Sequence, residues 1–249
     1  MSLSAPYYRI YRPSINKSCF EDKTFGYAQD CRYIDLHEKS SLLNATKLIL
    51  KDFIEILDYV EPCDANLQTF SHRIYELLLR TCTEIEANME GILNSNGYRK
   101  QGKGNINMDD YRKIESATKL SEYSVIMHQW RPDRTVRPFE AWNTPNKPLP
   151  WYKSYNEVKH ERSKNFEKAN LENLSNAICG LLCILYAQFG KAIGQIDNIS
   201  EKLVFSIEED IIEIGQFDIL LPTFLESEKY CFDWNELKDT QEPYSKYRF

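Results

Sequence analysis

The stretch WYKSYNEVKHERSKNFEKA, from Trp151 to Ala169, decides the fold that we predict for this chain. It follows a proline-rich segment and precedes the most apolar part of the sequence. As an α-helix, with ~100° between residues, it gathers its large apolar side chains on one stripe. The stripe consists of Trp151, Tyr155, Val158, Phe166 and Ala169. We therefore predict one helix over residues 151–169 that packs this stripe against the core.

Polar residues of the same stretch fall on two sides of the predicted helix. Arg162 lies inside the apolar stripe. Asn156 and His160 lie on the opposite side, where residues four apart are neighbours on a helix surface. Lys153 and Lys164 flank this pair on the same side. We therefore expect a cation aimed at the core and an Asn–His pair that faces away from it.

Three other segments have helical patterns that complete a bundle. Residues 41–60 and 66–93 each show an amphipathic stripe, and residues 171–193 include a part that is apolar on nearly every side. The last segment is the expected central, buried helix. A shorter helix is expected near residues 108–119. The predicted fold class is therefore mainly α, a helical bundle.

Minor β segments and long loops are expected outside the long helices, at both termini and in a crossover of residues 120–150. We predict short strands at residues 121–130, 135–142, 203–207 and 216–221. A helical core of about residues 40–195 then carries two extensions, residues 1–39 and 196–249. We expect both extensions to pack on the core within a single domain, residues 1–249.

The composition is that of an ordinary soluble globular protein. The 249 residues are 42% hydrophobic and 27% charged, and the formal net charge is −6. This charge disfavours a protein whose whole surface binds nucleic acid, but it is compatible with a local basic patch. The sequence contains neither a signal-peptide pattern nor an apolar run long enough to span a membrane. We therefore expect a cytoplasmic protein without membrane contact.

The cysteines indicate free thiols. The chain has seven of them, an odd number, and no Cys-x-x-Cys pair. Cys179 and Cys183 lie in an apolar helix without further Cys or His residues at the spacing of a zinc site. We expect reduced cysteines, no metal and no cofactor.

Two polar residues project from the apolar stripe of residues 66–93. They are Glu84, at the edge of the stripe, and Asn88, in its middle. A buried carboxylate or amide is costly unless it is paired. Because Arg162 also points toward the core, we predict a buried polar network of Glu84, Asn88 and Arg162.

His160 is the best candidate for catalysis, because histidine titrates near neutral pH and can act as acid or base. The candidate ligand-binding or phosphate-binding residues around it are Lys153, Asn156, Lys159 and Lys164. The alternative interpretation is an ordinary charged helix face, balanced by Glu157 and Glu161.

A second basic segment is the polar, glycine-containing loop GYRKQGKGNIN, residues 97–107. Its cations Arg99, Lys100 and Lys103 are suited to contact a phosphate. The loop lacks the GxxxxGK[ST] spacing of a P-loop. The alternative, a solvated loop, is favoured by the sequence.

Several segments together resemble the HEPN superfamily. They are RTCTEIEAN at residues 80–88, the proline-rich crossover, WYKSYNEVKHERSKNF at residues 151–166, and the apolar helix that follows. The narrower likeness is to uncharacterised bacterial proteins with a YNxVKHxR signature, and it covers about residues 40–195. The resemblance implies an all-helical, usually dimeric fold. In many members it implies a metal-independent ribonuclease, often in toxin–antitoxin, abortive-infection or other defence systems.

The HEPN motif pairs an arginine with a histidine four to six residues later, and only the histidine is matched here. His160 takes its position, whereas no arginine stands at residues 154–156 and Arg162 follows His160. Lys153 and Asn156 are the nearest substitutes. The role of the motif arginine is therefore unassigned.

Two functions follow from these residues. The first is a divergent, metal-independent HEPN ribonuclease that acts on RNA, with His160 as acid or base. The second is a non-catalytic helical module that binds a nucleotide, RNA or a partner protein. The unmatched arginine and the acidic net charge favour the second. The sequence leaves open whether the protein is an enzyme and whether it forms a homodimer.

Overall fold

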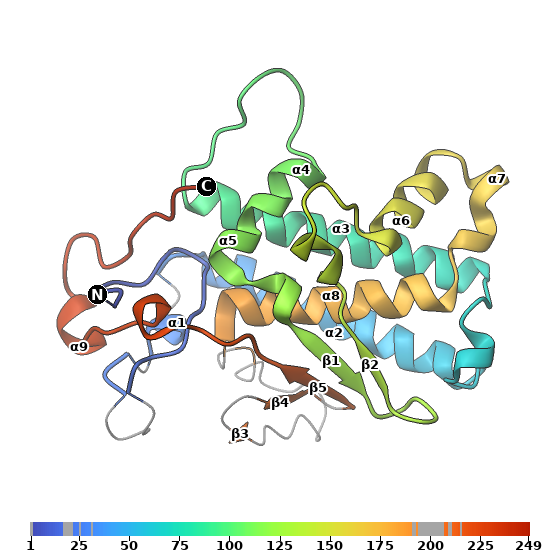
Figure 1. The fold of residues 1–249 in the computed structure, drawn as a ribbon, viewed down its shortest axis with the longest axis horizontal. Helices are drawn as coiled ribbons and strands as arrows, with labels where there is room; N and C mark the ends of the chain where they lie inside the picture. The colour runs from blue at the N-terminus through green and yellow to red at the C-terminus, as the bar shows by residue number, and fades with distance from the viewer. Residues whose placement is uncertain are drawn as a thin grey trace.

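The computed structural model describes residues 2–16, 22–24, 26–30, 32–190, 193, 207–208, 211–214 and 216–249. It is mainly α-helical, as predicted, with a small antiparallel sheet below the helices in the view of Figure 1. The four longest helices are α2 (Leu36–Leu57), α3 (His72–Ser95), α6 (Pro150–His160) and α8 (Leu171–Phe189).

Helix α8 is the buried centre of the bundle, as the sequence predicts. All of its residues from Ala177 to Phe189 are buried. It packs against α3 and α6, and α2 packs against α3 on the other side. Apolar burial of this kind stabilises by roughly 25 cal/mol per Å² of surface removed from water. The α3–α8 pair therefore supplies the scaffold for the remaining segments.

Capping residues define where the long helices begin. Asp35 accepts hydrogen bonds from the backbone of His37 and Glu38, so α2 begins five residues before its predicted start. Ser71 and Asn170 cap α3 and α8 in the same way. Proline at the first position of α6 fits a helix start, because that residue needs no backbone donor.

The sheet has the strand order β2-β1-β5-β4-β3, with antiparallel neighbours. Its strands are β1 (Ser124–Met127), β2 (Arg134–Val136), β3 (Ile207–Glu208), β4 (Ile211–Ile214) and β5 (Phe217–Leu220). Met127 of β1 touches Cys179 of α8, with 3.6 Å between their sulfur atoms. The predicted strands near 121–130 and 216–221 are thus present in shorter form. Most of the predicted strand at 135–142 is wrong, because β2 ends at Val136 and residues 140–143 form a 3₁₀ helix. Residues 203–206 of the fourth lie outside the described residues.

The proline-rich crossover is an ordered cover over the helices. Phe139 and Trp142 are buried and lie 4.9 Å apart by ring centroids, and Phe139 also meets Trp151. Short helices complete the fold: α1 (Tyr27–Asp30), α4 (Met108–Tyr111), α5 (Glu115–Thr118), α7 (Arg162–Asn165) and α9 (Trp234–Leu237). The predicted helix near 108–119 is therefore split into α4 and α5 by a 3₁₀ turn.

The two terminal segments lie side by side near the end of α3 (Figure 1). The Tyr8 amide donates to the Ser245 carbonyl at 3.3 Å, and the Ser245 amide donates to the Pro6 carbonyl at 2.8 Å. This pairing brings residues far apart in the sequence to one end of the bundle.

The predicted single helix over residues 151–169 is wrong, because the chain breaks at Glu161. Its backbone has φ −134° and ψ 58°, which is not helical. Helix α6 ends at His160, and α7 begins at Arg162 in a new direction. The side-chain amide of Asn165 donates to the carbonyls of Glu157 and Glu161, so it links α7 to the end of α6 across the break.

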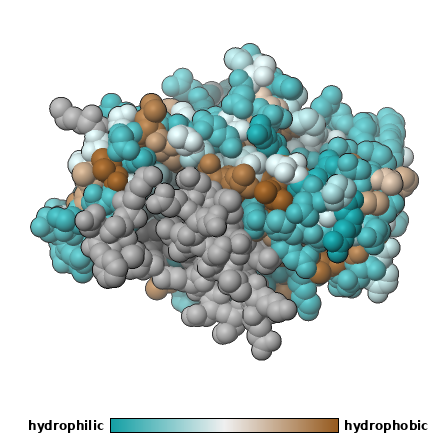
Figure 2. Space-filling view, turned by 60° about the horizontal axis from the view of Figure 1, so that its bottom comes forward, coloured by the Kyte–Doolittle hydropathy of each residue, from teal (hydrophilic) through white to brown (hydrophobic). Residues whose placement is uncertain are grey.

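None of the helices in the described part of the chain combines the length and apolar character needed to cross a membrane. On the face shown in Figure 2, hydrophilic residues cover most of the described surface, and hydrophobic residues gather in small groups.

Candidate functional site

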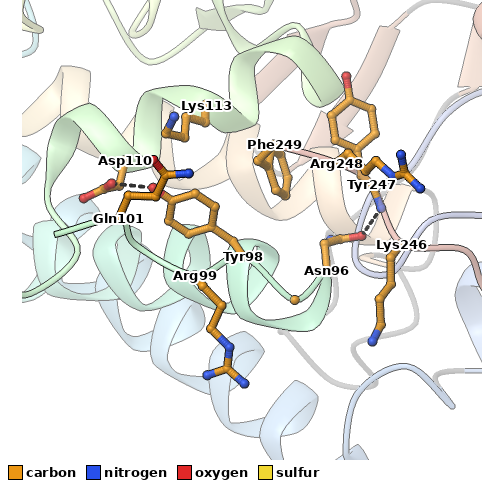
Figure 3. Close-up of a pocket in the computed structure, with 11 residues that line it drawn as sticks. Asn96, Tyr98, Arg99, Gln101, Asp110, Lys113, Lys246, Tyr247, Arg248 and Phe249 are labelled. Atoms are coloured by element: carbon orange, nitrogen blue, oxygen red, sulfur yellow. Dashed lines mark hydrogen bonds between the residues drawn. The ribbon is translucent and has the colours of Figure 1, made fainter.

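A cleft of about 740 Å³ lies where α3 ends, and we call it the basic cleft. It is lined by residues 96–99, Gln101, Asp110, Lys113 and residues 246–249 (Figure 3). Its walls therefore come from the loop after α3, from the α4–α5 region and from the C-terminal segment.

The end of α3 turns the chain into the basic cleft. Gly97 has φ +76°, a left-handed conformation that glycine adopts without strain. The Gly97 amide donates to Asn94 at 2.9 Å, and the Tyr98 amide donates to Leu93 at 3.0 Å. These two bonds form a Schellman motif, the common glycine-dependent end of a helix. The motif directs Tyr98 and the basic loop after it toward the cleft.

Asn96 joins three segments at the base of the cleft, and its side chain is buried. Its amide nitrogen donates to the carbonyls of Ile92 and Tyr8, both at 2.8 Å. Its amide oxygen accepts from the Tyr247 backbone at 2.8 Å. One side chain thus holds the C-terminal segment against the end of α3.

Three aromatic rings follow one another across the cleft, in the order Tyr98, Phe249, Tyr247 (Figure 3). Their centroids are 6.5 Å and 5.0 Å apart, and all three side chains are half-buried. The Tyr98 hydroxyl donates to Asp110 at 2.6 Å, and the Tyr247 hydroxyl donates to the Ser116 carbonyl at 3.0 Å. The protein therefore holds the tyrosine rings in place from their outer ends.

Four exposed cations surround these rings: Arg99, Lys113, Lys246 and Arg248. None of the four forms an ion pair with a described residue. Among the described side chains that line the cleft, Asp110 is the one carboxylate, and it is bound to Lys100 at 2.7 Å. The cleft is therefore positively charged.

Asp110 stays ionised in this position. Burial opposes its charge, but hydrogen bonds from Lys100, Tyr98 and the Asn107 backbone outweigh burial and lower the pKa of Asp110 to about 2. The carboxylate thereby fixes Lys100 and Tyr98 and takes no further cation from the cleft.

Two of the cations predicted around His160 differ from those of the basic cleft in having carboxylate partners. His160 is exposed at the last position of α6, as expected, and its ring makes no hydrogen bond with a described residue. Lys153 pairs with Glu157 at 3.9 Å, and Lys164 pairs with Glu161 at 3.1 Å. The geometry agrees with the alternative interpretation of a charged helix face balanced by its own carboxylates.

Asn156 lies one turn before His160 on α6, as predicted, and Lys159 directly precedes His160, but the side chains of Asn156 and Lys159 have other surroundings. The Lys159 ammonium donates to the Tyr155 hydroxyl at 2.9 Å and lies 5.0 Å from that ring's centroid. Asn156 and Lys153 line a smaller cavity of about 280 Å³, and His160 is not part of its lining. The structure therefore does not bring the predicted residues into one cavity.

The predicted burial of Arg162 with Glu84 and Asn88 is wrong. Arg162 is exposed, and its guanidinium lies 5.6 Å from the centroid of the Tyr75 ring. The break at Glu161 explains this, because it rotates Arg162 out of the apolar stripe. Glu84 is half-buried, and burial raises its pKa although Arg80 opposes the rise.

Asn88 is buried and paired, as its position demands, but the arginine in its network is Arg9. The Asn88 amide oxygen accepts from Gln188 at 2.8 Å, and the Gln188 amide oxygen accepts from Arg9 at 2.9 Å. Arg9 also pairs with Glu38 at 2.8 Å. Sequence reasoning missed Arg9, because it lies in a terminal extension.

Gly91 is the residue in the sequence that could have indicated that another segment approaches α3 closely. It stands inside a long helix, where glycine is unfavourable by roughly 1 kcal/mol relative to alanine. A Cβ atom at this position would lie 2.4 Å from the Arg9 guanidinium nitrogen Nη1. The missing side chain therefore makes room for Arg9.

The described histidines, cysteines, aspartates and glutamates form no group of three or more that could hold a metal ion. The described cysteines, Cys63, Cys82, Cys179, Cys183 and Cys231, are free, as predicted, whereas Cys19 and Cys31 lie outside the described residues.

No protein-family model matches this chain, and neither a curated protein nor a solved structure matches it.

Proposed function

We propose that this chain is a non-catalytic binding module for a phosphate-bearing ligand, a nucleotide or RNA, and that the ligand occupies the basic cleft. One observation carries the proposal: four exposed cations that no described carboxylate neutralises surround a cleft of about 740 Å³. Cations of this kind fix phosphate oxygens, and the neighbouring rings offer faces for bases.

Binding is favoured over catalysis by the residues of the cleft. No histidine stands among its described lining residues, and its one carboxylate is bound to Lys100 and Tyr98. A general base needs a free group whose pKa lies near the working pH. The cleft offers positioned charge and rings, which suit recognition.

The cleft proposal is tested by equilibrium binding of two probes, fluorescent ATP and a fluorescein-labelled single-stranded RNA of eight nucleotides. The cleft variant is Lys246→Glu/Arg248→Glu, and the control is Lys153→Glu/Lys164→Glu, which changes the net charge equally at α6–α7. We expect the cleft variant to lose about a hundredfold or more in affinity, because it removes two contacts to charged groups that contribute about 1.5–3 kcal/mol each. The control should bind like the wild type. Absence of binding by both probes at low salt, or equal losses in both variants, would refute the proposal.

The HEPN resemblance adds a setting and an alternative to this proposal. The setting is a defence or toxin–antitoxin system, in which the module acts as a homodimer or with a partner protein. The alternative is a ribonuclease that uses His160. We expect no cleavage of single-stranded RNA in chelator by the wild type. Cleavage by the wild type that His160→Ala abolishes would replace the binding module with the ribonuclease.

A further inference from the structure

We infer that the ligand of the basic cleft is a single-stranded nucleic acid whose successive bases lie on its row of rings, and not a mononucleotide or a duplex. This inference rests on the proposed function and names the ligand class for the same cleft. It follows from how the rings are oriented, how the cations are distributed and how the C-terminal segment presents both.

The orientations of the rings exclude a regular stack of bases. The Tyr98 and Phe249 planes are 85° apart, and the Phe249 and Tyr247 planes are 48° apart. The bases of a duplex are parallel, so they cannot lie on two such rings at once. A flexible single strand can turn each base separately, which is how sequence-tolerant stacking platforms bind.

The distribution of the cations fits a chain of phosphates. Arg99 and Lys113 come from different segments near the Tyr98 end of the row, and Lys246 and Arg248 flank Tyr247 at the other end. In Figure 3, Arg99 and Lys246 extend to the same side below the rings, whereas Lys113 and Arg248 lie at opposite ends of the row. A mononucleotide concentrates its phosphates at one point and cannot reach all of them. A polynucleotide carries one charge per nucleotide, so it can contact cations at both ends.

The C-terminal segment alternates cation and ring in the order Lys246, Tyr247, Arg248, Phe249. Successive side chains of an extended segment point to opposite sides. Accordingly, the two cations are exposed and the two rings are half-buried. Such a segment can follow a single strand with backbone contacts on one side and base contacts on the other.

The cleft is also built before any ligand arrives. Asn96 holds the Tyr247 backbone, and the hydroxyls of Tyr98 and Tyr247 are already bonded to Asp110 and Ser116. Groups that are fixed in advance lose little conformational entropy on binding. The rings therefore need no rearrangement to accept bases.

The test is a length series of fluorescein-labelled oligouridylates with one, two, four and eight nucleotides, and an eight-base-pair RNA duplex, at fixed low salt. Base–aromatic stacking is worth about tenfold in affinity per base or more. We expect the tetranucleotide to bind at least a hundredfold more tightly than the mononucleotide, and the duplex to bind more weakly than the single strand of equal length.

Ring variants separate stacking from charge. Tyr247→Leu and Phe249→Leu keep an apolar side chain and all four cations, so each should lower tetranucleotide affinity about tenfold and leave its salt dependence unchanged. Mononucleotide binding as tight as tetranucleotide binding, or equal binding of duplex and single strand, would overturn this inference and leave the proposed function standing. Absence of binding by every probe would overturn both.

Discussion

The two ends of α3 carry similar numbers of cations and differ in what surrounds them. At the Ser95 end, Arg99, Lys113, Lys246 and Arg248 converge on a cleft whose one described carboxylate is already bound to Lys100. At the His72 end, α6 and α7 lie close by through the contacts of Phe166 with His72 and Tyr75. There Lys153, Lys164 and Lys168 each pair with Glu157 or Glu161.

The difference shows how helical spacing helps to neutralise the cations of α6 and α7. Lys153 and Glu157 are four apart, and Glu161 and Lys164 are three apart, so a helix brings each pair together. Such exposed pairs add little stability, but they neutralise the charge that a phosphate would need. Arg99, Lys246 and Arg248 lie outside helices, and Lys113 pairs with neither Asp109 nor Asp110, although these precede it by four and three residues, so the four cations stay available.

The largest difference in stability should appear between variants of Arg9 and Arg162. Arg9→Met removes a buried donor to Gln188, so we expect the free energy of unfolding to fall by about 2–4 kcal/mol, from an unsatisfied buried oxygen and lost packing. Arg162→Met removes only an exposed contact with Tyr75, which is worth ~0.5–1 kcal/mol. Urea unfolding of both variants measures the difference. Equal losses would mean that Arg9 does not hold the network.

A smaller difference in stability should appear between variants of two asparagines, Asn96 and Asn165. The side-chain amide of each donates to two backbone carbonyls. Asn96 is buried and also accepts from Tyr247, whereas Asn165 is half-exposed at the α6–α7 break. Asn96→Ala leaves buried groups unpaired and should lower stability by about 1–3 kcal/mol, whereas water can replace the Asn165 side chain. Asn96→Ala should also weaken RNA binding, because the C-terminal segment loses its anchor. Thermal unfolding and RNA affinity of both variants test this. A larger effect of Asn165→Ala on either would reverse the comparison.

The smallest expected difference is between the contributions of Asp110 and Glu157 to stability at acid pH. Bonds from Lys100 and Tyr98 lower the pKa of Asp110 to about 2 against the effect of burial, and the bond from Lys168 lowers the pKa of Glu157. A group with a lowered folded pKa stabilises the protein above its unfolded pKa and loses that contribution as pH falls through the folded pKa. For Asp110 the loss should therefore extend from about pH 4 to about pH 2.

Urea unfolding of wild type, Asp110→Asn and Glu157→Gln across this range measures the two contributions at low and high salt. We expect the Glu157 contribution to be small and to vanish in high salt, because the pair is exposed. The Asp110 contribution should persist in high salt. If Asp110→Asn does not change how stability depends on pH in acid, then Asp110 does not hold Lys100 and Tyr98 as described.

The long helices and their order could be predicted from the sequence, because apolar periodicity is local and strong. The buried character of α8 follows from its own residues, as does the cover provided by Phe139 and Trp142. The break at Glu161 could not be predicted in this way, because the apolar stripe continues across it in sequence. Arg162 was misplaced as a direct consequence.

Only one side of the basic cleft, the loop after α3, could be predicted from the sequence. Of the loop cations predicted to contact a phosphate, Arg99 lines the cleft, whereas Lys100 is bound to Asp110 and Lys103 is not part of the lining. No local signal connects that loop with residues 246–249. The connection runs through Asn96 and through the pairing of Tyr8 with Ser245, both of which are long-range contacts. The Asn96-Gly97 pair indicates a helix end, and residues 246–249 alternate cation and ring, but neither signal indicates that the two segments meet.

The most direct test of the central claim is the salt dependence of single-stranded RNA affinity. For single strands, the logarithm of the binding constant falls with the logarithm of salt concentration with a slope of about −0.7 per phosphate contact, so four contacts give about −3. We predict this slope for the wild type and for Lys153→Glu/Lys164→Glu, and about half its magnitude for Lys246→Glu/Arg248→Glu. An unchanged slope in the cleft variant, with a reduced slope in the α6–α7 variant, would contradict the account and move the phosphate site to the other end of α3.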